Sequence, residues 1–343
     1  MRVHPANRKQ WFPLRSNSII LLISILLFSL VSCNKPEKSA GPREKITIAY
    51  STAVNAILVY ITFAKGYFAE EGLDVTPQAH AFGKSALNAV FEGKADLATV
   101  ADTPIVFAVM NGKKITTLAV IQTANRDNAI VARQDRGIAK PADLKGRKVG
   151  VTLGTNADFF LGAFLLAHDL DRGKVKIIDL KPDEMAAALD AGKVDAVSAF
   201  NPTLNLLKKG LGNKGTVFFG ESLYTENFCV VAMQEYARKH PAAITKILRA
   251  LLRAETFVQQ NPEEARRLVA NFINIDRALL DEIWSIFTTK VTLDQGLLVD
   301  FEAQTRWVLK NQLTSGTSMP NYLGYIYFDG LHAVKPEAVR IIR

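Results

Sequence analysis

The sequence predicts an α/β fold built from two units, each a largely parallel sheet with crossover helices. Short apolar runs rich in β-branched residues alternate with helical patterns, and this alternation starts again after Arg126. An apolar strand at residues 227–233 is placed to return from the second unit to the first. The 343 residues suffice for two domains, and 48% hydrophobic with 22% charged residues is typical of a globular protein rather than a disordered or coiled-coil chain.

In the first unit, each predicted strand runs directly into the start of a helix. Gly, Ser, Thr and Pro residues mark these junctions, as expected where a strand ends and a helix is capped. The predicted strands cover residues 45–50, a segment that starts at Gly72, and residues 95–100. The predicted helices begin near Val54, with a short continuation after Gly66, at Gly83 and at Thr103.

The second unit repeats this pattern, and the chain then becomes helical. Strands are predicted at residues 148–151, 175–179 and 194–199, with helices from Gly154 to His168, around residues 182–190 and after Asn201. From His240 onward the pattern is almost entirely helical, with starts at Pro241, Asn261 and Asp294. The C-terminal residues Val334, Val339, Ile341 and Ile342 are expected to pack on the first unit.

The first 32 residues are predicted to be an export signal. A basic stretch ending at Arg15 precedes an apolar run at residues 19–31, which is shorter than the roughly 20 residues that span a bilayer and suits a secretion signal. The run closes on Leu30-Val31-Ser32-Cys33, which resembles a lipoprotein lipobox, so Cys33 is the predicted lipidation site. Residues 33–44 then form a polar, Pro- and Gly-containing tether. The alternative is an uncleaved anchor with an incidental cysteine.

Charge and cysteine content exclude several classes of protein. Four basic residues precede residue 33, where there is no acidic residue, so the net charge of the remaining chain falls from +9 to +5. Without a basic block, this excess does not indicate nucleic-acid binding. The second cysteine, Cys229, lies in an apolar run and is expected to be a buried thiol. No Cys-x-x-Cys or His-x-x-x-His spacing indicates a metal site.

An ordered set of motifs resembles the nitrate, sulfonate and taurine type of substrate-binding protein of ABC importers, related to the thiamine-pyrimidine precursor-binding group. Residues 66–75 (GYFAEEGLDV) match its G-x-F-x-x-x-G-L-x-V segment. Further matching segments are GKAD at 93–96, ADTP at 101–104, DLKGRKVGV at 143–151, Gly154-Thr155, GKVDA at 192–196 and NPEEA at 261–265.

The resemblance implies a type II periplasmic-binding fold whose two lobes close on a small solute. Residues 45–126 with 228–343 would form lobe 1, with the helical C-terminal region packed on it, and residues 127–227 would form lobe 2. The implied role is a lipid-anchored, exported monomer that delivers a small polar organic solute or oxyanion to the permease and ATPase subunits, without a cofactor. A sensory component of a signalling system, and a pyrimidine-precursor binding protein or synthase, remain alternatives.

Candidate ligand contacts lie where strands end and helices begin, because helix N-termini offer backbone N–H groups there. Hydroxyl and amide side chains can bond a polar solute at these points, although the same residue types also cap helices. The ring of Phe82 would line the ligand site, and Gly83 and Gly154 would let the backbone approach the ligand closely. The predicted ligand-binding residues are Ser51, Thr52, Phe82, Gly83, Ser85, Thr103, Thr152, Gly154, Thr155, Asn156 and Asn201.

Other residues near these loops leave alternatives open. Tyr50 and Phe200 would either wall an apolar ligand moiety or belong to the core. Lys84 would attract an anion and Asp102 an amine, and either could instead be solvated. Catalysis has few candidates, because His80 is expected at the surface of a strand end, and Gly83-Lys84-Ser85 lacks the earlier glycine of a phosphate-binding loop, since position 78 is Gln. The chain is therefore expected not to be an enzyme.

Overall fold

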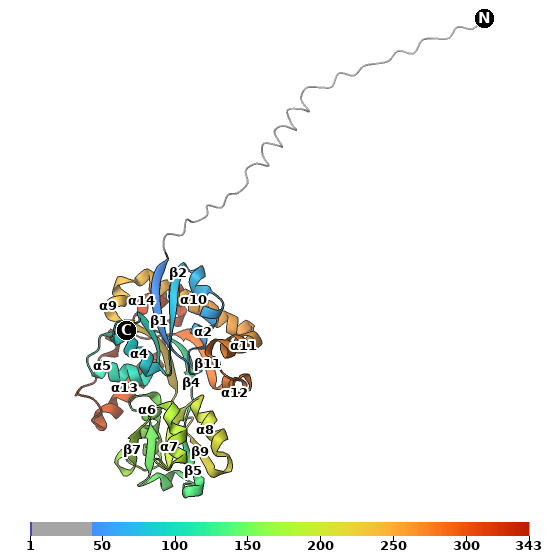
Figure 1. Cartoon of the computed structure of the whole chain (residues 1–343). Coiled ribbons are helices and arrows are strands. Elements are labelled where there is room, and N and C mark those ends of the chain that lie inside the picture. Colours follow the sequence, from blue (N-terminus) through green and yellow to red (C-terminus); the bar gives the residue numbers. More distant parts are fainter. Residues whose placement is uncertain (2–42, 343) are drawn as a thin grey trace. The chain divides into compact units, whose positions relative to one another are not determined.

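The computed structural model describes residue 1 and residues 43–342 (Figure 1). The predicted signal at residues 1–32, Cys33 and the tether up to residue 42 lie outside the described residues, apart from the exposed Met1. The predicted end of the tether at residue 44 is wrong by one residue, because Glu44 pairs with Leu73 as the first residue of strand β1 (Glu44–Ser51).

Six strands form the larger sheet, in the order β11-β4-β10-β3-β1-β2. Strand β1 is parallel to β2 and β3, whereas β10 runs antiparallel between β3 and β4. The predicted return strand is thus β10. The bounds of the other strands are β2 (Leu73–His80), β3 (Leu97–Ala101), β4 (Ile115–Ala124), β10 (Glu226–Met233) and β11 (Phe287–Thr292).

Five strands form the smaller sheet, in the order β7-β6-β8-β5-β9. Strands β6, β7 and β8 are parallel, and β5 runs antiparallel to β8 and β9. In Figure 1 this sheet, coloured green to yellow, lies below the larger one. The strands are β5 (Asn128–Arg133), β6 (Lys148–Val151), β7 (Lys176–Asp179), β8 (Ala196–Phe200) and β9 (Gly215–Phe219).

Helices cover both sheets, and we call each sheet with its helices the six-stranded unit and the five-stranded unit. The six-stranded unit carries α2 (Ile57–Ala64), α3 (Tyr67–Glu70), α4 (Gly83–Phe91), α5 (Asp102–Met110), α9 (Gln234–Lys239), α10 (Pro241–Gln260), α11 (Pro262–Ile273), α12 (Arg277–Ile283), α13 (Gln295–Lys310) and α14 (Phe328–Val334). The five-stranded unit carries α6 (Asn156–Ala167), α7 (Met185–Asp190) and α8 (Thr203–Leu211).

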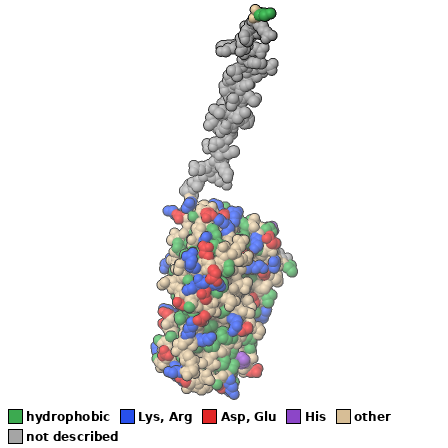
Figure 2. Space-filling model, turned by 90° about the vertical axis from the view of Figure 1, so that its right-hand side faces the viewer, with side chains coloured by type: hydrophobic (Ala, Val, Ile, Leu, Met, Phe, Trp, Pro, Cys, Tyr) green, Lys and Arg blue, Asp and Glu red, His purple; other side chains and the backbone are tan. Residues whose placement is uncertain are grey.

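Short 3-10 helices connect these elements at η1 (Gln134–Arg136), η2 (Pro141–Leu144), η3 (Arg172–Lys174), η4 (Pro182–Glu184), η5 (Gly212–Lys214), η6 (Trp284–Ile286), η7 (Tyr322–Tyr325) and η8 (Pro336–Ala338). Within the part of the chain that the structure describes, no helix is both long and apolar enough to cross a membrane. Basic and acidic side chains are interleaved over the face of the molecule that Figure 2 presents.

The predicted α/β fold class is confirmed, but two C-terminal details are wrong. Strand β11 occupies a segment predicted as helical, because its β-branched residues pair with the open edge of β4. After α14 the chain forms only a 3-10 turn and a bridge between Leu293 and Val339. Ile341 is buried as expected, whereas Ile342 is 80% exposed and does not pack on the sheet.

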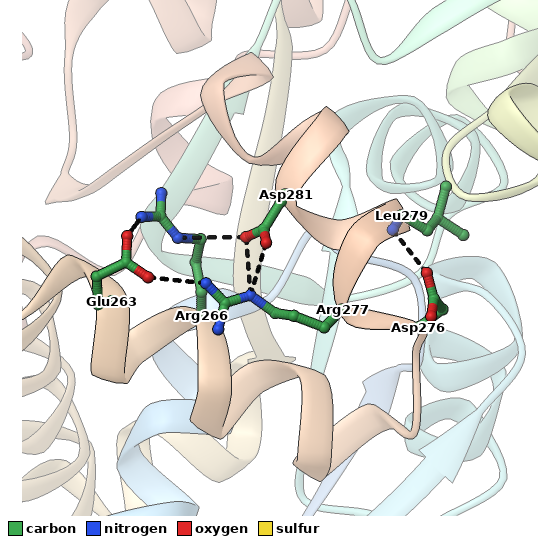
Figure 3. A network of polar contacts seen from close by, with 6 residues as sticks. All are labelled: Glu263, Arg266, Asp276, Arg277, Leu279 and Asp281. Atoms are coloured by element: carbon green, nitrogen blue, oxygen red, sulfur yellow. Dashed lines mark hydrogen bonds and ion pairs between the residues drawn. The ribbon is translucent and has the colours of Figure 1, made fainter.

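Ion pairs hold the corner between α11 and α12 (Figure 3). Arg277 contacts Glu263 at 2.8 Å and Asp281 at 2.8 Å, and Arg266 contacts the same two carboxylates. Asp276 caps α12 by accepting a hydrogen bond from a backbone N–H of its first turn at 2.9 Å. Because these pairs lie at the surface, each stabilises the corner by about 1 kcal/mol or less.

Candidate ligand-binding site

A small cavity lies where loops of the two units meet at the carboxyl ends of their strands. Its volume is about 10 Å³, which admits no more than a water-sized group in this conformation. A larger solute therefore requires the two units to move apart. The cavity is lined by Asn55, Phe82, Gly83, Lys84, Ala101, Pro104, Thr155, Asn156, Phe200 and Phe228.

The start of helix α4 forms one side of this cavity. Phe82 is the extended N-cap residue, and Gly83 begins the helix directly against strand β3. A Cβ atom at Gly83 would lie 3.0 Å from Val100 Cα and 3.3 Å from the Thr99 carbonyl oxygen. Only glycine allows this approach without a shift of backbone, and it brings the N-terminal N–H groups of α4 to the cavity.

Lys84 connects the two units across the cavity. Its Nζ donates a hydrogen bond of 2.7 Å to the carbonyl oxygen of Leu153, in the loop after β6. Gly154 follows with a φ of +68°, and a Cβ there would lie 3.1 Å from the same Nζ. The loop therefore turns with a left-handed glycine and leaves room for the lysine. This contact joins α4 of the six-stranded unit to the N-terminal side of α6.

The base of the cavity is a buried amide and carboxyl network. Asn156 Nδ2 donates to Glu226 Oε2 at 2.7 Å and to Asn128 Oδ1 at 3.0 Å, while Asn128 Nδ2 donates to the same Glu226 oxygen at 3.0 Å. Burial raises the pKa of Glu226 well above its usual value, and the neighbouring Asp127 and Asp102 carboxyls raise it further. The network ties the start of α6 to both chain crossovers between the units, because Asn128 begins β5 and Glu226 begins β10.

Two more buried carboxyls lie beside these crossovers. Burial raises the pKa of Asp127 to about 7, and this side chain faces Glu226 and Asn201. Burial also raises the pKa of Asp102 to about 7, against hydrogen bonds from Tyr224 and from Asn227, whose Nδ2 lies 3.1 Å away. Asp102 is therefore hydrogen-bonded to residues of the second crossover and is not solvated.

The structure brings four of the predicted ligand-binding residues to the small cavity: Phe82, Gly83, Thr155 and Asn156. A larger cavity, described below, includes Thr52. Several predicted hydroxyls bond the local backbone instead. Ser85 donates to the Phe82 carbonyl oxygen at 2.7 Å, and Thr152 donates to the Leu180 carbonyl oxygen at 2.6 Å.

The remaining predicted residues lie deeper or elsewhere. Ser51 is fully buried and accepts a hydrogen bond from the Ala53 N–H at 3.1 Å. Thr103 is fully buried at the start of α5. Asn201 lines a separate surface pocket with residues of α8 and α12. Gly154 contacts Lys84, as described above.

Three residues with open interpretations are now placed. Tyr50 packs against Tyr60, Phe63 and Phe272 in the core of the six-stranded unit. His80 ends β2 half-buried, and burial lowers its pKa. Cys229 is fully buried in β10, as expected.

Sequence reasoning missed Asn55, Asn128 and Glu226. Asn55 lies only four residues beyond the first strand, within a loop already singled out. Glu226 is an acidic residue at the start of an apolar strand, a pattern that indicates a buried partner. Its partners Asn128 and Asn156 are 98 and 70 residues away, a distance that no local pattern connects.

A larger cavity adjoins the small one, and we call it the apolar groove. Its volume is about 470 Å³, in the range of small-molecule sites. Thr52, Ala53 and Ala81 contribute from the six-stranded unit, and α7 and α8 contribute most of the remaining lining. Phe200 lines both cavities. No group of three His, Cys, Asp or Glu residues in residues 43–342 is arranged to hold a metal ion.

Two α/β units that meet at a polar cavity beside their crossovers define a two-lobed binding-protein architecture. Comparison with known families agrees: residues 53–265, more than half of the chain, match the NMT1/THI5 like family. The chain belongs to this family.

Individual relatives and structures support the same assignment. The "Putative aliphatic sulfonates-binding protein" of Bacillus subtilis is 26% identical over 307 residues, covering 85% of this chain and 91% of that protein. The taurine-binding periplasmic protein of Escherichia coli is 24% identical over 222 residues, covering 64% and 68%. The crystal structure of the alkanesulfonate-binding protein SsuA from Xanthomonas axonopodis bound to MOPS has a TM-score of 0.73 at 17% identity, covering 84% of this chain and 99% of that one. The structural match carries the fold alone.

Proposed function

We propose that this protein is the exported solute-binding component of an ABC importer and that its solute carries a sulfonate or a similar oxyanion. The observation that carries the proposal is the cavity between the two units, where Lys84 meets the first N–H groups of α4 and, at Thr155 and Asn156, the start of α6. These donors suit an anionic head group. The relatives named for aliphatic sulfonates and taurine support the same class of solute.

We also propose that the solute is captured by closure of two lobes, residues 45–126 with 228–343 and residues 127–227. The grouping of β1–β4, β10 and β11 in one sheet and β5–β9 in the other supports this division. The crossovers near residues 122–128 and 224–228 would absorb the rotation. In the described conformation the Lys84 contact bridges the units, so they lie closer together here than they would around a bound sulfonate.

Binding and transport can be tested together. Calorimetry with the purified protein should detect binding of a small alkanesulfonate, and the sulfonate released by denaturation should be recovered chemically intact by NMR. Cells that lack the gene should lose uptake of that sulfonate at low concentration. Binding of no sulfonate, taurine or nitrate would reject the proposed class of solute, and a product that disappears in His80→Ala would show an enzyme instead.

The predicted lipid anchor at Cys33 is part of the proposed role, because it would hold the protein beside the permease. Cells grown with labelled palmitate should incorporate label into the native protein and not into Cys33→Ala. Cys229→Ala is the matched control and should keep the label, since that thiol is fully buried. Label retained in Cys33→Ala, or an intact residue 1 on the mature protein, would contradict the anchor.

A further inference from the structure

The apolar groove has a composition that the proposed oxyanion site does not explain. Leu189, Leu207 and Leu211 are buried beneath it, whereas Leu206 is 55% exposed although it is a large apolar residue. An exposed leucine inside a concave, apolar lining gains stability when an apolar group covers it. The groove is thus suited to an aliphatic or aromatic group.

The groove and the small cavity are formed by the same loops. In the loop after β1, Ala53 lines the groove and Asn55 lines the small cavity. In the loop after β2, Ala81 lines the groove and Phe82 lines the small cavity. Phe200 lines both spaces. A single solute can therefore place its head group at the small cavity and extend past Phe200 into the groove once the units open.

The rim of the groove carries acidic side chains. Asp183 and Asp190 both line it, and both are exposed in the chain segment around α7. Asp190 is paired with Arg133 Nη1 at 3.9 Å, so among the described residues of the rim Asp183 supplies the unpaired carboxylate. This negative charge and the apolar lining disfavour a second anionic group in the groove. The groove thus favours a solute with a single negative charge at one end.

We propose that the solute is an amphiphilic monoanion whose apolar body occupies the groove between α7 and α8. This inference rests on the proposed function for the head group and adds the chemistry of the rest of the solute. Nitrate and taurine have no apolar body to cover Leu206, so they are poor ligands. Longer alkanesulfonates are preferred.

A homologous series measures the contribution of the groove. Calorimetry with ethanesulfonate, butanesulfonate and hexanesulfonate should show affinity rising about threefold for each methylene group that becomes buried, on the order of 100-fold across the series. Hexane-1,6-disulfonate should bind at least about tenfold more weakly than hexanesulfonate, because its second sulfonate must lie against an apolar lining and beside the Asp183 carboxylate.

Two neighbouring alanines of α7 provide a matched pair of variants. Ala186 lines the groove and Ala187 does not, and both are exposed on the same helix. Ala186→Trp should fill the groove and weaken hexanesulfonate at least about tenfold, with ethanesulfonate changed by less than about threefold. Ala187→Trp should bind both like the native protein. Leu206→Asn should also weaken hexanesulfonate, by removing apolar contact without adding volume.

The outcomes separate this inference from the proposed function. Equal affinity for ethanesulfonate and hexanesulfonate, unchanged in Ala186→Trp, would overturn the groove and leave sulfonate binding intact. Binding of no member of the series would overturn the proposed function and, with it, the inference. A steep dependence on chain length that is lost in Ala186→Trp and kept in Ala187→Trp would establish the groove as part of the site.

Discussion

Unfolding by urea should require less free energy at pH 8 than at pH 5, by roughly 2 kcal/mol or more. The cause is the set of buried carboxyls at the crossovers, since burial raises the pKa of Asp102 and of Asp127 to about 7 and the pKa of Glu226 well above its usual value. Unfolding exposes these groups to water, where their pKa values return to about 4.

The sign follows from proton binding. Below about pH 4 these carboxyls are protonated in both states, so the stability associated with the raised pKa values is fully present there. As the pH rises toward 7, the unfolded chain loses these protons while the folded protein retains them, and stability falls by on the order of 1 kcal/mol per pH unit for each group. His80 makes the protein more stable as the pH rises, because burial lowers its pKa. This is a single half-buried group, so its effect is smaller than that of the three buried carboxyls.

The variant Asp127→Asn tests whether the loss of stability between pH 5 and pH 8 comes from the carboxyls at the crossovers. The variant cannot titrate at position 127, so the difference in stability between pH 5 and pH 8 should shrink by on the order of 1 kcal/mol or more. Asp171→Asn, an exposed position on the five-stranded unit, should leave the native difference unchanged. An unaltered pH dependence in Asp127→Asn would mean that this carboxyl is ionised in the folded protein at pH 5.

The elements of the fold could be predicted because local patterns carry them. Strand β6 begins and ends at the predicted residues, and α4 begins at the predicted Gly83, since an apolar run and a glycine at the strand-to-helix junction specify both. Strand β11 could not be predicted in the same way. Only its last two residues, Val291 and Thr292, are buried, and it forms by pairing with the edge of β4, more than 160 residues earlier in the chain.

The sequence predicts which loops form the candidate site, but it predicts less well which of their side chains line the cavity. Loops at strand ends were expected to carry it, and Phe82, Gly83, Thr155 and Asn156 line the cavity. Hydroxyl residues cap helices and bind ligands by the same chemistry, so the sequence does not separate these roles; Ser85 bonds its own helix start. The groove was missed because its leucines follow the helical spacing of an ordinary core.

Lys84→Met should weaken hexanesulfonate binding by at least about tenfold. The ammonium group donates to the Leu153 carbonyl oxygen at 2.7 Å and also lines the small cavity. When the units part to admit the solute, this donor is released and places a positive charge beside the head group. A hydrogen bond from a charged donor contributes about 1.5–3 kcal/mol, and about 1.4 kcal/mol corresponds to a tenfold change in affinity. Methionine keeps the length of the side chain and loses both the charge and the hydrogen-bond donor.

The matched control is Lys94→Met, at the exposed turn after α4, where the lysine pairs only with Glu92 at 2.6 Å in a well-solvated position. That variant should bind hexanesulfonate like the native protein, because exposed ion pairs contribute about 1 kcal/mol or less and this one lies away from the cavity. Lys84→Arg retains the charge and should recover part of the lost affinity. Native affinity in Lys84→Met would show that the lysine charge does not contribute to binding of the solute. The head group would then be bound by the first backbone N–H groups of α4 and α6 alone.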